Sequence, residues 1–166
     1  MKSATIAPNP TAEYEGISVR KILVPIDFSP ASKKALWYAL RIAEVRNSEI
    51  TLLHVVEPQD PALAGRPASA AFSEQESEEA LRGLVDSAKA VSAVRTNSIF
   101  RTGVATHEII EAAKELDVDL IVIAAHGLSG WKRFALGSTA ERVARAATCP
   151  VLVVRQKEHD ASEAKT

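Results

Sequence analysis

Residues 119–143 read DLIVIAAHGLSGWKRFALGSTAERV and contain the pattern that decides the fold. The apolar run at the start lacks the alternation of a half-exposed strand, so it predicts a strand buried on both faces. A glycine-rich loop follows, and the run beginning at Ser138 predicts a helix. A buried strand that passes through a loop into a helix is the repeating unit of a parallel α/β sheet.

The same unit recurs along the rest of the chain. We expect strands at 21–27, 48–58, 96–103, 118–125 and 150–155, and helices at 29–47, 74–91, 105–117 and 138–148. Ser29 and Pro30 have the residue types preferred at the N-cap and at the first helical position. Strict alternation with unbroken apolar strands predicts an α/β fold, a doubly wound five-stranded parallel sheet with helices on both faces.

The 166 residues fit a single domain of ordinary size. We place this domain at 19–156, between a flexible tail at 1–18 and a charged tail at 157–166. Within it, 58–73 are rich in Pro, Ala and Ser and predict a long mobile loop.

Composition and charge exclude several classes of protein. The formal net charge of −1 gives no general attraction to nucleic acid, and no apolar run reaches the roughly 18 to 20 residues of a membrane span. The first residues lack the apolar core of a signal peptide, so we expect a cytoplasmic protein. Cys149 is the only cysteine, which rules out a disulfide within the chain and favours a small buried hydrophobic residue over a redox role.

A doubly wound sheet binds its ligands beyond the carboxyl ends of the strands. The turns to inspect are therefore those after residues 27, 56, 103 and 124. Two of them carry unusual residues, 25–29 (PIDFS) and 124–139.

The second of these turns has the residues of an anion-binding loop. Backbone N–H groups that converge at a helix N-terminus attract phosphate, helped by the helix dipole. Gly137 would let a phosphate approach the backbone, and Ser138 and Thr139 would supply hydroxyl donors or cap the helix. We expect Gly127 to turn the chain with a positive φ. From these residues alone, a phosphate site and an ordinary turn with a helix cap remain alternatives, and neither a Walker loop nor GxGxxG is present.

Other side chains of the loop have two interpretations each. His126 either bonds a backbone carbonyl and shapes the turn or approaches phosphate oxygens. Trp131 and Phe134 either anchor the loop to the body of the protein or cover a ligand. Lys132 and Arg133 would add positive charge near a polyphosphate.

The sequence contains few residues in arrangements typical of catalytic sites. Asp27 and His126 are the evident candidates for a general base, although Asp27 could instead cap the helix after Phe28. His54 lies within an apolar strand, which favours a hydrogen-bonded core histidine. No Ser-His-Asp order and no paired His-Glu metal motif is present, so we expect turnover to be slow or absent.

Residues 20–155 resemble the universal stress protein family, in the branch that binds ATP. The resemblance rests on the segments KILVPIDFS, ITLLHVVEP and CPVLVV together with 119–143. The ATP-binding motif of the family is Gly, two residues, Gly, nine residues, then Gly with Ser or Thr. Here Gly127 is the second glycine and Gly137 with Ser138 forms the end, whereas Ala124 replaces the first glycine.

The resemblance implies a Rossmann-like sheet of the adenine nucleotide alpha hydrolase type, with strand order 3-2-1-4-5. It also implies a set of nucleotide-binding positions at the strand ends and the last helix. Asp27 with Pro25 and Ile26 would face the adenosine, Val55 the adenine through its backbone, Ile123, Ala124 and Gly127 the ribose and α-phosphate, and Gly137, Ser138 and Thr139 the phosphates, with His126 in the same loop.

The family further implies a Mg or Mn ion on the triphosphate, near Asp27 or Ser138, and a homodimer that pairs through the last strand, Val151 to Arg155. We therefore expect an ATP-binding regulatory dimer of the stress response. Two alternatives stay open. Ala124 favours a nucleotide-free dimeric interaction module of the same fold, and an electron-transfer or adenylyl-transferring enzyme could share the strand order.

Overall fold

The computed structural model describes residues 18–57, 74–127 and 136–155. The expectations for the two terminal tails and for the loop at 58–73 lie outside the described residues. So do those for the loop side chains Trp131, Lys132, Arg133 and Phe134.

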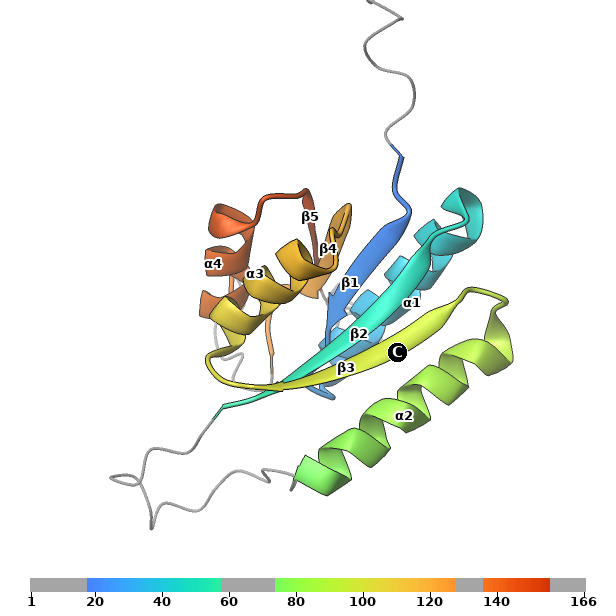
Figure 1. The fold of residues 1–166 in the computed structure, drawn as a ribbon, viewed down its shortest axis with the longest axis horizontal. Helices are drawn as coiled ribbons and strands as arrows, with labels where there is room; N and C mark the ends of the chain where they lie inside the picture. The colour runs from blue at the N-terminus through green and yellow to red at the C-terminus, as the bar shows by residue number, and fades with distance from the viewer. Residues whose placement is uncertain (1–17, 58–73, 128–135, 156–166) are drawn as a thin grey trace, which may run out of the picture.

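Five strands and four helices alternate along the chain. The strands are β1 (Lys21–Pro25), β2 (Glu49–Val56), β3 (Thr96–Thr102), β4 (Leu120–Ala124) and β5 (Val151–Val154), and the helices are α1 (Pro30–Arg46), α2 (Glu74–Val91), α3 (Ala105–Glu115) and α4 (Ser138–Ala146). All neighbouring strands are parallel, and their order is β3-β2-β1-β4-β5 (Figure 1). The predicted α/β class and strand order are confirmed.

The helices cover both faces of the sheet, so each face has its own apolar core (Figure 1). On one face, α1 and α2 pack with buried residues such as Leu36 and Leu81. On the other, α3 and α4 contribute Ile109 and Val143. Because the inner strands are covered on both sides, β1 and β4 are almost continuously apolar, whereas β2 also carries Thr51 and His54.

Helix α1 begins and ends at residues that satisfy its terminal backbone groups. Ser29 is the N-cap, its side chain accepts from the N–H of Ser32 at 3.1 Å, and Pro30 takes the first helical position, as predicted. Asn47 ends the helix in the left-handed region with φ 55°, and its N–H bonds the carbonyl of Ala43.

The start of β4 differs from the prediction by two residues. Val118 is apolar and buried, but it lies in the turn before the strand, which begins at Leu120. The side chain of Asp119 accepts from the N–H groups of Arg20 and Lys21, at 2.8 and 2.9 Å. This side chain therefore joins the starts of β1 and β4, and the N–H of Asp119 also donates to the carbonyl of Lys21 at 3.0 Å.

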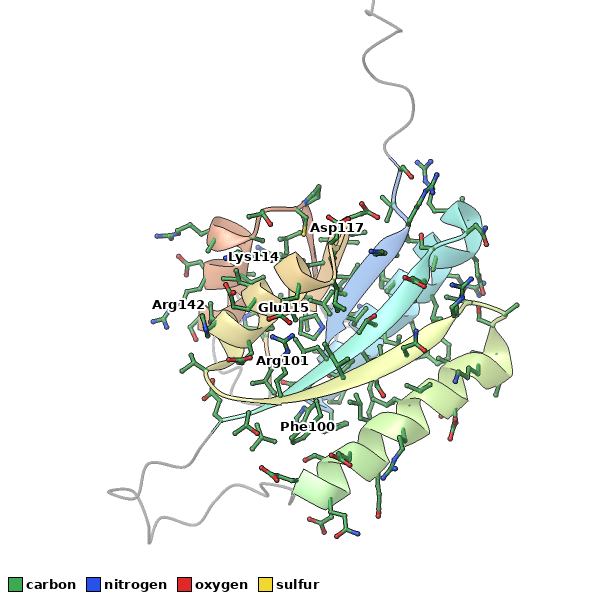
Figure 2. All side chains as sticks on the ribbon, in the orientation of Figure 1. Phe100, Arg101, Lys114, Glu115, Asp117 and Arg142 are labelled. Carbon is green, nitrogen blue, oxygen red and sulfur yellow. The ribbon has the colours of Figure 1, made fainter. Side chains whose placement is uncertain are left out.

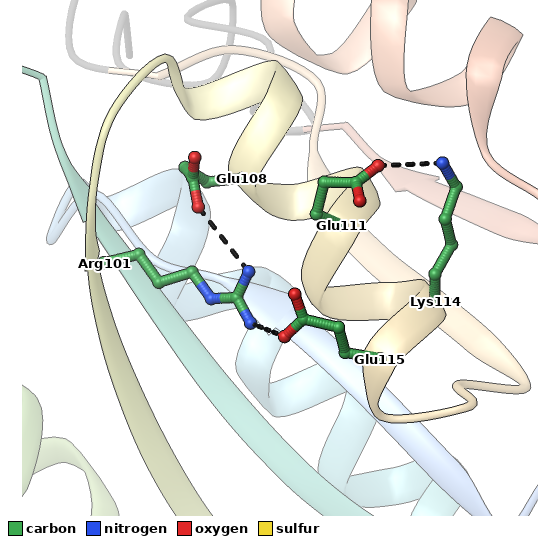
Figure 3. Close-up of polar contacts among 5 residues, drawn as sticks. All are labelled: Arg101, Glu108, Glu111, Lys114 and Glu115. Atoms are coloured by element: carbon green, nitrogen blue, oxygen red, sulfur yellow. Dashed lines mark hydrogen bonds and ion pairs between the residues drawn. The ribbon is translucent and has the colours of Figure 1, made fainter.

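An ion-pair cluster fastens β3 to α3. Arg101 extends from β3 toward the helix, where its Nη1 lies 3.5 Å from Oε2 of Glu108 and its Nη2 donates to Glu115 (Figures 2 and 3). Arg101 and Glu108 are about four-fifths buried, at 21% and 19% side-chain exposure. The hydrogen bond with Glu115 raises the pKa of Arg101. Because Glu108 is largely desolvated, loss of its cation would cost more than loss of an exposed ion pair.

Among the described residues, no helix combines the length and the apolar character needed to cross a membrane. Cys149 is half-buried and packs against the core under α3 and α4. Burial raises the pKa of its thiol, which disfavours the reactive thiolate.

Candidate functional site

A cleft of about 310 Å³ lies at the carboxyl ends of β1, β2 and β4, beside the starts of α3 and α4. This is where a doubly wound sheet binds its ligands. Every site position predicted from the sequence lines it: Pro25, Ile26, Asp27, Val55, Ile123, Ala124, His126, Gly127, Gly137, Ser138 and Thr139. The structure thus brings together residues from four separate segments of the chain.

The cleft exists because β1 ends earlier than β2. The last bond between them runs from the N–H of Ile26 to the carbonyl of Leu53, at 2.8 Å. On the other side of β2, the carbonyl of Val56 accepts from Gly103 in the chain that follows β3. Backbone groups alternate in direction along a strand, so the N–H and C=O of Val55 point past the end of β1. They face the cleft, which suits a planar ring with a donor and an acceptor.

Gly127 lies against Asp27. A Cβ on Gly127 would be 2.5 Å from Oδ2 of Asp27, closer than any real contact. The expectation of a positive φ at Gly127 is wrong, because Gly103 is the glycine of the described residues with that conformation. Glycine is therefore required by the approach of the Asp27 carboxylate across the cleft, and not by backbone conformation.

The turn after β1 is held by local bonds. Oδ1 of Asp27 accepts from the N–H of Ser29 at 3.0 Å, so this carboxylate does fix the turn that precedes α1. Phe28 takes a left-handed φ of 63°. Its ring centroid lies 4.5 Å from that of His54, whose Nδ1 is 2.7 Å from the carbonyl of Ile26. The expected hydrogen bond of His54 is present, although the residue is half-buried and not part of the fully buried core.

Gly137 is the N-cap of α4, and its environment differs from the expected one. Its N–H donates to the carbonyl of Ala125 at 2.8 Å and is therefore engaged within the protein. A Cβ on Gly137 would lie 2.9 Å from the same carbonyl oxygen. The structure thus gives a reason for glycine that the sequence did not indicate, the close approach of the Ala125 backbone.

The anion donors come instead from the first turn of α4. The N–H groups of Ser138, Thr139 and Ala140 have no acceptor within the helix, because the first intrahelical bond runs from Glu141 to Gly137. No side chain caps this end, and all three residues line the cleft. Three N–H groups and the positive end of the helix dipole make this end of the cleft favourable for an anion.

His126 carries an unsatisfied polar atom. Its Nε2 is buried and has no hydrogen-bond partner, and it is the one such side-chain atom found among the described residues. A buried ring nitrogen without a partner costs about 1–3 kcal/mol. The side chain belongs to a residue that lines the cleft, so a ligand that supplied a partner would recover part of this free energy.

Sequence reasoning missed the residues at the other end of the cleft. Glu57, Ala105 and Ile109 line it, and Oε1 of Glu57 accepts from the N–H of Ala105 at 3.0 Å. The signal was present for Glu57, which directly follows the second strand at a turn that the topology marks. Ala105 and Ile109 carry no such signal, because they reach the cleft only through the packing of α3.

A second hollow, of about 940 Å³, lies at the amino ends of β1, β2 and β3. It is larger, but charged residues in its wall are engaged with one another or with backbone, as in the pair of Arg95 with Glu49 at 3.2 Å. The helix N-termini lie at the carboxyl ends of the strands, so the smaller cleft there is the better candidate for a ligand site. In the described ranges, no group of three or more His, Cys, Asp or Glu residues could hold a metal ion.

Comparison with known proteins places this geometry in a family. The profile of the universal stress protein family matches residues 18–155. The chain belongs to the universal stress protein family. Among curated universal stress proteins, YxiE of Bacillus subtilis (strain 168) is 36% identical over 154 residues, with 81% of this chain and 98% of YxiE covered.

Solved structures of universal stress proteins share the fold. UspA from Lactobacillus plantarum superposes with a TM-score of 0.70 at 32% identity, over 82% of this chain and 98% of UspA. A universal stress protein solved in complex with cAMP gives a TM-score of 0.66 at 26% identity, over 84% and 99% of the two chains. A nucleotide is thus bound by a relative of the same architecture.

Proposed function

We propose that this universal stress protein binds ATP in the cleft and acts as a nucleotide-sensing regulatory dimer in the stress response. The observation that carries the proposal is the cleft itself, with the open first turn of α4 at one end and the outward-facing backbone of Val55 at the other. The relative in complex with cAMP supports an adenine nucleotide as the class of ligand.

The phosphates belong at α4 in this proposal. The N–H groups of Ser138, Thr139 and Ala140 donate to phosphate oxygens, and the hydroxyls of Ser138 and Thr139 add two donors. Gly127 and Gly137 keep side chains out of the space between the loop and the helix. In the tautomer that carries its proton on Nε2, His126 donates a hydrogen bond to a phosphate oxygen.

The adenosine belongs between β1 and β2. Pro25, Ile26 and Asp27 face it from the turn after β1, and the backbone of Val55 bonds the edge of the adenine. Ile123 and Ala124 cover the ribose from β4. A Mg or Mn ion would be held mainly by the triphosphate, with Asp27 or Ser138 beside it, and would screen the phosphate charge.

The dimer is proposed to form through β5. This strand lies at the edge of the sheet with β4 as its neighbour, so its other side presents backbone groups that a second copy can pair. Nucleotide binding is proposed as the main activity, with slow hydrolysis at most, because Oδ1 of Asp27 already holds the turn before α1. The cytoplasm is the compartment we expect.

Isothermal titration with ATP and with adenosine tests the phosphate end of the site. Ser138→Pro removes one N–H donor and the hydroxyl, and proline is tolerated at the first helical position. Gly137 already has φ −61° and ψ 146°, as a residue before proline requires. We expect ATP affinity to fall about 10- to 100-fold, the loss of a hydrogen bond to a charged group. Adenosine affinity should stay unchanged, and Ser138→Ala should fall between wild type and Ser138→Pro.

Two results would reject the proposal. If the wild type takes up no adenine nucleotide at millimolar concentration, the nucleotide-free interaction module is the better description. If ATP binds but Ser138→Pro leaves its affinity intact, the phosphates lie elsewhere. Phosphate release at several per second, lost in Asp27→Ala, would overturn the view that turnover is slow.

A further inference from the structure

We infer that Glu57 determines which base the cleft accepts, by taking a hydrogen bond from the 6-amino group of adenine. The inference rests on the proposed function, because it assumes that a nucleotide occupies the cleft. It adds a residue that the binding motif does not include and that belongs to a different end of the site.

The cleft is electrostatically polar along its length. At one end, the first turn of α4 presents N–H donors and the positive end of a helix dipole. At the other end, one residue beyond the end of β2, the exposed carboxylate of Glu57 lies with Ala105 and Ile109 and offsets the positive end of α3 by accepting from its first turn. A nucleotide therefore binds with its phosphates at α4 and its base near Glu57, since the reverse orientation would place phosphate beside a carboxylate.

Glu57 has one oxygen in use and one available. Its Oε1 accepts from the N–H of Ala105 at 3.0 Å, which satisfies a donor in the first turn of α3 and holds the side chain at the cleft. Among the described residues, this is the one hydrogen bond that Glu57 makes. The second oxygen can accept but not donate, because an ionised carboxylate carries no hydrogen.

The cation on the neighbouring strand does not neutralise this carboxylate. Arg101 is paired with Val55 in the register of β2 and β3, but its guanidinium is engaged by Glu108 and Glu115 (Figure 3). The base end of the cleft thus presents a carboxylate that only accepts hydrogen bonds. It favours a base whose edge carries an amine and disfavours one whose edge carries a carbonyl.

Inosine triphosphate is the matched probe, because it carries a carbonyl in place of the 6-amino group and has the same sugar and phosphates. For the wild type we expect ATP to bind about tenfold more tightly than ITP, a modest ratio because water competes at an exposed side chain. Glu57→Gln keeps an acceptor for the N–H of Ala105 and adds an amide donor for the carbonyl of ITP. It should lower the ATP preference at least about fivefold.

The control is Glu111→Gln, which also removes one negative charge. Glu111 lies on α3, pairs with Lys114 (Figure 3) and does not line the cleft. The variant should leave the preference unchanged. A wild type that binds ATP and ITP equally, or a Glu57→Gln protein that keeps the full ATP preference, would overturn the inference while nucleotide binding stands. If neither nucleotide binds the wild type, the proposed function fails and this inference fails with it.

Discussion

The Cβ position of Gly127 lies 2.5 Å from Oδ2 of Asp27, so the chain after β4 and the carboxylate after β1 occupy adjoining space. The two residues are 100 positions apart in the sequence, and each belongs to a different strand end of the cleft. A side chain at position 127 would therefore force the Asp27 carboxylate to move.

Gly127→Ala should lower the free energy of unfolding by about 1–2 kcal/mol, because the new methyl group displaces Asp27 and breaks its bond to Ser29. Gly83→Ala is the matched control. Nothing lies within 4 Å of its Cβ position, and it is exposed in the middle of α2. This control should be neutral or stabilise the protein by about 0.5–1 kcal/mol. Urea denaturation measures both.

A double-mutant cycle separates the collision from a general intolerance of alanine at this position. Asp27→Ala removes the carboxylate that the methyl group meets, so Gly127→Ala should cost clearly less in that background. Equal costs in both backgrounds would show that the contact with Asp27 is not the reason for glycine.

Arg101→Gln should lower the free energy of unfolding by about 1–3 kcal/mol, because it leaves Glu108 largely buried without its cation. Arg95→Gln breaks a pair in which the arginine side chain is 78% exposed, and should cost about 0.5 kcal/mol or less. Thermal or chemical denaturation of the two variants gives the comparison. Similar losses would mean that Arg101 contributes no more than a surface ion pair.

Val153→Pro tests the proposed dimer without breaking the sheet. The carbonyls of Pro150 and Val154 accept from β4, so by alternation the N–H of Val153 faces away from β4, at the free edge. Proline there removes a donor available to a second copy, and sedimentation or light scattering should show a dimer becoming a monomer.

The control for this variant is one residue away. Leu152 pairs with Val122, and its N–H faces β4, so Leu152→Pro should destabilise the fold itself by about 2–3 kcal/mol. A monomeric wild type, or a Val153→Pro protein that stays dimeric, would rule out pairing through this edge.

The order of elements was predictable because it depends on local patterns. Buried strands read as apolar runs, and Ser29 with Pro30 marks the start of α1 in sequence and in structure. The start of β4 was not predictable, because Val118 is as apolar as a strand residue yet packs in a turn. Apolar character reports burial and does not report hydrogen-bond pairing.

The two glycines of the site show a similar limit of prediction from sequence. The sequence identified Gly127 and Gly137 as positions where a side chain would be harmful, but assigned one to a positive φ and the other to phosphate. The structure gives two contacts within the protein, with Asp27 and with the carbonyl of Ala125. Such reasons depend on distant segments meeting, which a motif cannot specify.

The short first strand controls whether this fold has room for a ligand at all. β1 stops opposite Leu53, while β2 runs on to Val56. If the turn at Asp27 came two residues later, the new backbone would pair with Val55 and fill the hollow from within. The sheet, both cores and the edge at β5 would remain. A change in the length of one loop can therefore turn a receptor for small molecules into a protein with no receptor site, without altering its architecture.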